Sequence, residues 1–200
     1  MSKHIISRFI NTISKKDDKE YLFAILLYFI APTIHGVKPS TIVTLKHQGR
    51  NLNSLWNKHK EEFKNSYNVE FYEIKSDNES TTILFYHLEE LTNTLKCNEN
   101  LVFLNKFGYT EDMTVEECIE YLKSRFDFNG CPHEMGIFLG IPIEDVITFM
   151  ENPDKKCVMC GYWKVFNNVE KARKKFYDYD KSKIKIIRNI LSSDIETYSV

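Results

Sequence analysis

Residues 68–87, NVEFYEIKSDNESTTILFYH, contain the stretch that decides the fold. NVEFYEIK at 68–75 alternates with the period of two that is typical of a half-buried strand, and TTILFYH at 81–87 is rich in β-branched and aromatic residues. The polar SDNES segment between them is typical of a turn. The stretch therefore predicts a β-hairpin.

The segments around this hairpin predict helices together with two further strands. A β-branched strand is expected near 41–45 and another strand at 160–166. Thr114 and Glu117 form a capping box at the start of a helix, Pro132 is expected to begin a helix that stops at Gly140, and Pro32 is expected to end an earlier one. Further helices are expected at 3–14, 19–30, 51–66, 87–96, 99–107 and 142–152, and after Val169.

This order of elements lacks regular strand–helix–strand alternation. It predicts an α+β fold with a small mixed or mainly antiparallel sheet of about four strands, covered by several helices. A length of 200 residues suits one globular domain over 1–200. The longest apolar run, YLFAILLYFIAP at 21–32, is too short to cross a bilayer, so a buried helix is expected there and no membrane partner.

Composition indicates a cytoplasmic protein. The N-terminal residues lack a continuous apolar segment of the secretory type, and five cysteines are an odd number in a chain large enough to fold without disulfides. The net charge of −1 disfavours nucleic acid as a partner. Lysines and arginines between 171 and 188 are interleaved with acidic residues, which favours a solvated helix face.

Three segments carry a family resemblance: APTIHGVKPS at 31–40, PHEMGIFLGIPIEDVITFMEN at 132–152 and GYWKVFNNVEKARKKFYDYDK at 161–181. With the motifs APT-x-x-G-x-K, PHE-x-G-x-FLG and GYWKV, the chain resembles an uncharacterised bacterial family, common in clostridia-type anaerobes and catalogued as a domain of unknown function. The resemblance implies no activity, substrate, cofactor or catalytic residue.

The same segments hold the candidate metal ligands. Cys157 and Cys160 form a CxxC pair, and with Cys131 and His133 they would make a four-ligand CxH…CxxC site for zinc or iron. The alternative is that these cysteines only pack or face solvent. A thioredoxin-type role is disfavoured because Cys160 leads into a strand rather than a helix.

Candidate catalytic residues are His133, Glu134 and His35. Near a helix start, Glu134 suits the positive end of the helix dipole, and His133 could act as a general base with Glu134 or His35 assisting. The alternative is a purely structural role at the helix start.

Candidate ligand-binding residues are Thr33 and Lys38 in the APTIHGVK segment and Tyr162 and Lys164 in the GYWKV segment. Three functions remain open. The favoured one is a cytoplasmic accessory protein of anaerobic metabolism that binds a small ligand or metal between the APTIHGVK loop and the PHE helix. The others are an enzyme with His133 as base and a non-catalytic protein-interaction module.

Overall fold

The structure is a computed structural model that describes residues 3–129 and 131–197. The strands are β1 (Ser40–Lys46), β2 (Glu70–Ser76), β3 (Ser80–Tyr86), β4 (Met159–Cys160) and β5 (Lys164–Val165). The helices are α1 (Lys3–Ile13), α2 (Asp18–Ile34), α3 (Leu52–Tyr67), α4 (Leu88–Lys96), α5 (Asn98–Asn105), α6 (Val115–Asn129), α7 (Met135–Phe138), α8 (Ile143–Glu151) and α9 (Val169–Thr197). The predicted α+β class is confirmed.

The predicted hairpin is the centre of the sheet. Strand β3 pairs with β1 on one side and β2 on the other, both antiparallel, so the order is β1-β3-β2. In the turn, the Asp77 carboxylate accepts hydrogen bonds of 2.8 Å from the backbone N–H groups of Glu79 and Ser80. This local arrangement explains why SDNES reverses the chain.

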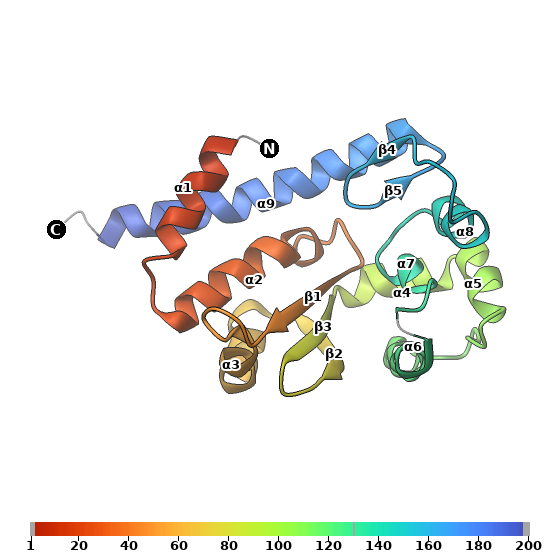
Figure 1. The fold of residues 1–200 in the computed structure, drawn as a ribbon, viewed down its shortest axis with the longest axis horizontal. Coiled ribbons are helices and arrows are strands. Elements are labelled where there is room, and N and C mark those ends of the chain that lie inside the picture. The colour runs from red at the N-terminus through yellow and green to blue at the C-terminus, as the bar shows by residue number, and fades with distance from the viewer. Residues whose placement is uncertain (1–2, 130, 198–200) are drawn as a thin grey trace.

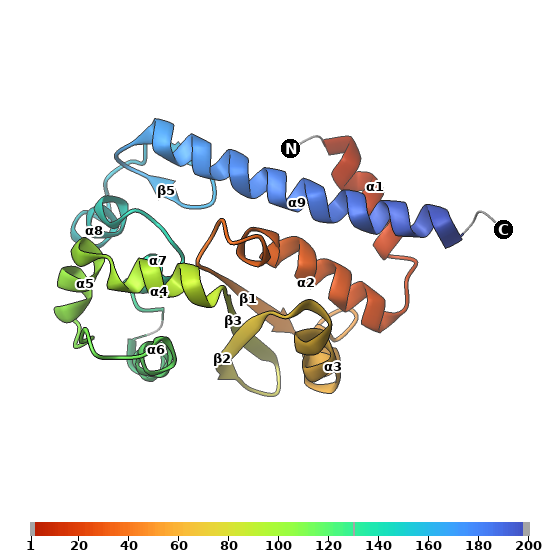
Figure 2. The same ribbon diagram turned by 180° about the vertical axis from the view of Figure 1, so that it is seen from behind.

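Both faces of β3 are buried. Ile83 and Phe85 point toward α2 and α3, whereas Leu84 and Tyr86 point toward the cluster built by α4 to α8. Figures 1 and 2 place α3 and α6 on opposite sides of the three-stranded sheet. Because successive side chains of a strand point to opposite faces, β3 joins two apolar cores.

The long helix α9 connects the two ends of the molecule (Figures 1 and 2). Its N-terminal part packs through Ala172 and Tyr179 against the β4–β5 hairpin, and Ile187 and Leu191 pack against α1 and α2. No helix of the described residues has both the length and the apolar character needed to cross a membrane.

Several local predictions are confirmed. The capping box forms, since Glu117 accepts from the Thr114 N–H at 2.8 Å and Thr114 Oγ1 accepts from the Glu117 N–H at 3.2 Å. Gly140 has a φ of +72°, the left-handed conformation that ends a helix, and a Cβ there would lie 2.7 Å from Pro39. The APTIHGVK segment therefore packs closely on the end of the PHE segment.

Three boundaries predicted from the sequence were wrong. Helix α2 runs through Pro32 to Ile34, because proline near a helix end removes one hydrogen bond while burial of Ile30 to Thr33 stabilises the last turn. The PHE helix is the single turn α7, preceded by a turn at His133 and Glu134. The strand expected at 160–166 is the short hairpin of β4 and β5, which bends at residues 161–163.

Truncation of Phe85 should be strongly destabilising. Its side chain is fully buried, with ring centroids at 5.5 Å from Trp56 and 6.0 Å from Phe63. We expect Phe85→Ala to lower the free energy of unfolding by about 3–5 kcal/mol in urea titrations. Phe29→Ala, at a position that is 44% exposed, is the control and should cost much less. Equal losses in the two variants would contradict a core centred on β3.

Candidate functional site

A pocket of about 560 Å³ lies between the α7 segment, α8 and the β4–β5 hairpin. Its lining is mostly apolar or aromatic, with a few polar side chains at the edge. The lining residues are Cys131, Pro132, His133, Met135, Gly136, Leu139, Ile141, Asp145, Val146, Phe149, Tyr162, Trp163 and Lys164. A pocket of this size and character is typical of small-molecule sites.

Asp145 fixes the wall formed by the hairpin. This carboxylate is 3% exposed, and its Oδ2 accepts a 2.8 Å hydrogen bond from Trp163 Nε1. Its Oδ1 accepts 3.0 Å hydrogen bonds from the backbone N–H groups of Phe166 and Asn167 and from Asn167 Nδ2. Because one carboxylate satisfies four donors, it ties the first turn of α8 to the hairpin and orients the Trp163 indole.

Gly136 allows α7 to lie directly on α8. A Cβ at this position would be 2.7 Å from Cγ2 of Val146, a distance that side-chain packing does not tolerate. The glycine of the PHE-x-G motif is thus required by helix packing in the wall of the pocket.

Two polar groups at the pocket edge, His133 and Lys164, contact Phe149. The His133 ring packs edge-on against Phe149 with centroids 5.7 Å apart, and Lys164 Nζ lies 5.4 Å from the Phe149 centroid. Burial raises the pKa of the Cys131 thiol, and the Glu134 carboxylate raises it further, so this sulfur is protonated at neutral pH. The pocket therefore offers an ammonium, an imidazole and a thiol around an apolar floor.

Of the predicted catalytic residues, the structure brings only His133 to this pocket. Glu134 is 1% exposed, does not line the pocket and is ion-paired with Arg125 of α6. His35 lines a different hollow beside α9. The enzyme hypothesis consequently retains His133 without the two expected assistants, and a catalytic role for it stays a prediction.

The predicted metal ligands are distributed over two places. Cys131 and His133 lie on the pocket, while Cys157 and Cys160 are neighbours in and before β4, where contact with the Cys157 thiol raises the pKa of Cys160. Within residues 3–129 and 131–197, no three side chains among His, Cys, Asp and Glu are grouped as a metal site would require. The four-ligand site remains a prediction from the sequence.

The four predicted ligand-binding residues also lie in different places. Tyr162 and Lys164 line the pocket. Thr33 is fully buried and shares a 2.8 Å hydrogen bond with Thr41, so its hydroxyl already has a partner. Lys38 is half-buried under α9, with its Nζ 5.9 Å from the centroid of the Tyr179 ring.

The loop that contains Lys38 leads into the contacts that hold the PHE segment. Ser40 Oγ donates a 2.6 Å hydrogen bond to the Phe138 carbonyl, and Lys175 of α9 donates to the Gly140 carbonyl at 3.0 Å. The Ser40 hydrogen bond and the packing of Pro39 on Gly140 join the APTIHGVK segment directly to the PHE segment. The pocket was expected between these two segments and lies instead between the PHE segment, α8 and the hairpin.

Two residues of this pocket that the sequence did not identify as candidate site residues are Asp145 and Phe149. Pro142, Asp145 and Phe149 are spaced at three and four residues, which places them on one face of α8. The sequence did contain an indication of the role of Asp145. Its carboxylate lies on the apolar face of IPIEDVITF, and a buried charge needs hydrogen-bond partners.

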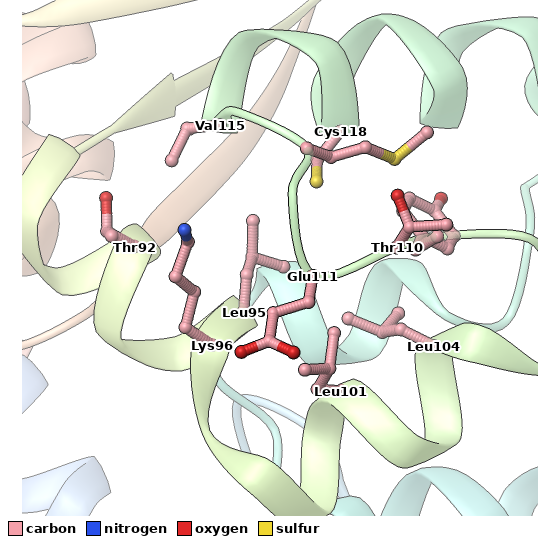
Figure 3. Close-up of a pocket in the computed structure, with 11 residues that line it drawn as sticks. Thr92, Leu95, Lys96, Leu101, Leu104, Thr110, Glu111, Val115 and Cys118 are labelled. Atoms are coloured by element: carbon pink, nitrogen blue, oxygen red, sulfur yellow. The ribbon is translucent and has the colours of Figure 1, made fainter.

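A second hollow, between α4, α5 and the start of α6, is too small for a ligand. Figure 3 shows its lining, with the side chains of Lys96, Glu111 and Cys118 around it. Its volume of about 10 Å³ is no more than one water requires. Burial raises the pKa of Cys118 to about 11, so this thiol stays protonated and is a poor nucleophile.

The fold and pocket define a class: a small α+β protein with an apolar pocket whose rim carries a cation and an imidazole. The chain belongs to the family described as "Protein of unknown function (DUF3793)", which matches residues 26–197. Neither a curated protein nor a solved structure matches the chain. The family assignment confirms the resemblance to an uncharacterised family and gives no activity.

Replacement of Asp145 should loosen the hairpin. Asp145→Asn puts an amide where the carboxylate meets four donors, so we expect a loss of about 2–4 kcal/mol in unfolding free energy. A red shift of the tryptophan emission should accompany it, because Trp163 loses its hydrogen bond to the carboxylate. The control is Glu144→Gln, an exposed neighbour on the same turn, which should change neither quantity. An Asp145→Asn variant as stable as the control would show that this carboxylate does not hold the hairpin.

Burial of Lys38 is expected to make the free energy of unfolding depend on pH. Burial, aided by repulsion from Lys183, lowers the pKa of Lys38 from 10.5 to about 8. The folded state then binds this proton less well than the unfolded chain, so the stability cost is full below pH 8 and disappears as the pH rises to 10.5. We expect Lys38→Met to be more stable than wild type at pH 7 by about 1–3 kcal/mol.

Urea titrations of wild type and Lys38→Met between pH 7 and 10.5 check this expectation. The difference between the two proteins should narrow as the pH rises. Lys46→Met, which removes an exposed lysine at the end of β1, should show no such trend. A Lys38→Met variant that is less stable than wild type at every pH would contradict the burial of a charged amine.

Proposed function

We propose that this protein binds a small ligand with an apolar or aromatic body and one anionic group in the pocket between α7, α8 and the β4–β5 hairpin. The observation that carries the proposal is the 560 Å³ pocket itself, whose wall is fixed by the four hydrogen bonds of Asp145. A wall held in place before binding loses little conformational entropy when a ligand arrives.

The chemistry of the lining supports this class of ligand. Met135, Leu139 and Ile141 offer apolar surface, and the faces of Phe149 and Trp163 suit a flat ring. Lys164 supplies one positive charge, exposed at the rim beside Phe149. An anionic group pairing with Lys164 while the ring lies over the apolar floor would satisfy both parts of the pocket.

The role proposed is that of a ligand-binding accessory protein rather than an enzyme. Asp145 lines the pocket but accepts four hydrogen bonds from Trp163, Phe166 and Asn167, and Glu134 is paired with Arg125, so each carboxylate is already engaged in a structural contact. The cysteine content supports a cytoplasmic location, and the family resemblance supports a setting in anaerobic metabolism.

Binding of 8-anilinonaphthalene-1-sulfonate, a ring system with one sulfonate, tests the proposal. Binding is followed by the dye fluorescence and by quenching of the tryptophan emission, to which Trp163 in the pocket wall contributes. Phe149→Ala should weaken binding by about tenfold, because an aromatic contact is worth about 0.5–1.5 kcal/mol beyond its area. Val158→Ala, a 67% exposed position in the same hairpin that does not line the pocket, is the matched control and should leave the affinity unchanged.

The charge is tested separately with Lys164→Gln. This variant should bind the sulfonated dye more weakly than wild type, whereas its affinity for the uncharged N-phenyl-1-naphthylamine should be unchanged. Thermal melts establish that each variant is folded, because the sulfonated dye also binds partially folded chains. Absence of dye binding, or equal binding by Phe149→Ala and Val158→Ala, would overturn the proposed ligand class.

A further inference from the structure

A larger hollow, of about 530 Å³, lies on another part of the surface, beside α9. One wall is the segment after α2, with His35 and Val37, and the other is a face of α9 between residues 178 and 189. Figures 1 and 2 show α9 running alongside α2, so the end of α2 and its following loop lie against this helix. This hollow shares no lining residue with the pocket of the proposed function.

The α9 wall is strongly basic. Lys181, Lys185 and Arg188 follow one another at spacings of four and three residues, which places them on one helix face. The lining contains a single carboxylate, Asp178. Within the described part of the chain, no carboxylate forms an ion pair with any of the three cations. The hollow therefore holds an excess of positive charge, although the whole chain has a net charge of −1.

The positive charge of α9 affects His35 on the opposite wall. His35 faces the hollow, and burial lowers its pKa, with a further lowering from the positive charge of Lys185. The ammonium of Lys185 therefore acts across the hollow on the imidazole. An anion placed between them would interact favourably with both, because it would offset the repulsion that now disfavours a protonated His35.

The remaining lining adds apolar groups. The Ser182 hydroxyl already donates a 3.0 Å hydrogen bond to the Asp178 carbonyl within α9. Val37 is 43% exposed, and Ile184 lies on the same helix face of the hollow. A guanidinium and two ammonium groups suit phosphate oxygens, since arginine can donate two parallel hydrogen bonds to one phosphate. Val37 and Ile184 would contact an uncharged part of the same molecule.

We propose that this hollow is a binding site for a small phosphorylated molecule carrying at least two negative charges, held by Lys181, Lys185 and Arg188 with His35 on the facing wall. A small molecule fits better than a nucleic acid, because the positive charge is confined to one hollow and the whole chain is slightly acidic. The site is separate from the apolar pocket and would bind its ligand independently.

The test uses inorganic pyrophosphate and the full chain, followed by isothermal titration calorimetry at constant ionic strength. The variant Lys185→Gln/Arg188→Gln removes two charges from the hollow. Its matched control, Arg173→Gln/Lys174→Gln, removes two exposed charges from the same helix outside the hollow. We expect the first variant to bind pyrophosphate at least about tenfold more weakly than wild type, since it loses two charged hydrogen-bond donors to the anion. The control should bind as wild type does.

A second readout locates the anion. The imidazole resonances of His35, identified by their loss in His35→Gln, should shift when pyrophosphate is added, and the pKa of His35 should rise. Lys164→Gln should leave pyrophosphate binding unchanged, which separates this site from the pocket of the proposed function.

Three results would overturn the proposal. The first is absence of pyrophosphate binding. The second is equal weakening by the two double variants, which would indicate attraction to the general charge of α9. The third is tighter binding of a single-stranded oligonucleotide than of pyrophosphate, lost in both double variants, because it would identify the helix face as a nucleic-acid surface.

Discussion

The structure depends on burial of strand β3 on both of its faces. Ile83 and Phe85 belong to the core under α2 and α3, while Leu84 and Tyr86 belong to the core of α4 to α8. A slip of one residue in the register of β3 would exchange these two sets, so the two cores fix the register together. Helix α9 and the pocket are placed relative to this strand, because each of them packs on elements that one of these cores positions.

The three motif segments, 31–40, 132–152 and 161–181, contact one another through hydrogen bonds and close packing beside the pocket. The Ser40 hydroxyl bonds to the Phe138 carbonyl, Gly140 lies against Pro39, and Asp145 holds Trp163. These contacts connect the end of α2, the α7 segment and the β4–β5 hairpin. The motifs therefore specify how three distant parts of the chain meet, and the pocket is the space left on one side of that meeting point.

The two proposed binding sites differ in the physical basis of recognition. In the apolar pocket, removal of ring and aliphatic surface from water would provide most of the binding free energy, and Lys164 would orient the ligand. In the hollow beside α9, three cations are near His35 with one carboxylate, so Coulombic attraction would dominate and would weaken with salt. Their lining residues do not overlap, which allows each to be altered without the other.

The sequence by itself determined the local elements whose causes are local: the hairpin around SDNES, the capping box of Thr114 and Glu117, and the left-handed turn at Gly140. It also named His133, Tyr162 and Lys164 as candidate site residues, and these line one pocket, although the pocket was expected beside the APTIHGVK loop. Only the tertiary structure decided that Glu134 pairs with Arg125, that Asp145 binds the hairpin, and that His35 faces α9. These pairings join residues from different elements. Helical periodicity shows which face of an element is apolar but not which element packs against it. That arrangement follows from tertiary packing, in which both faces of β3 are buried.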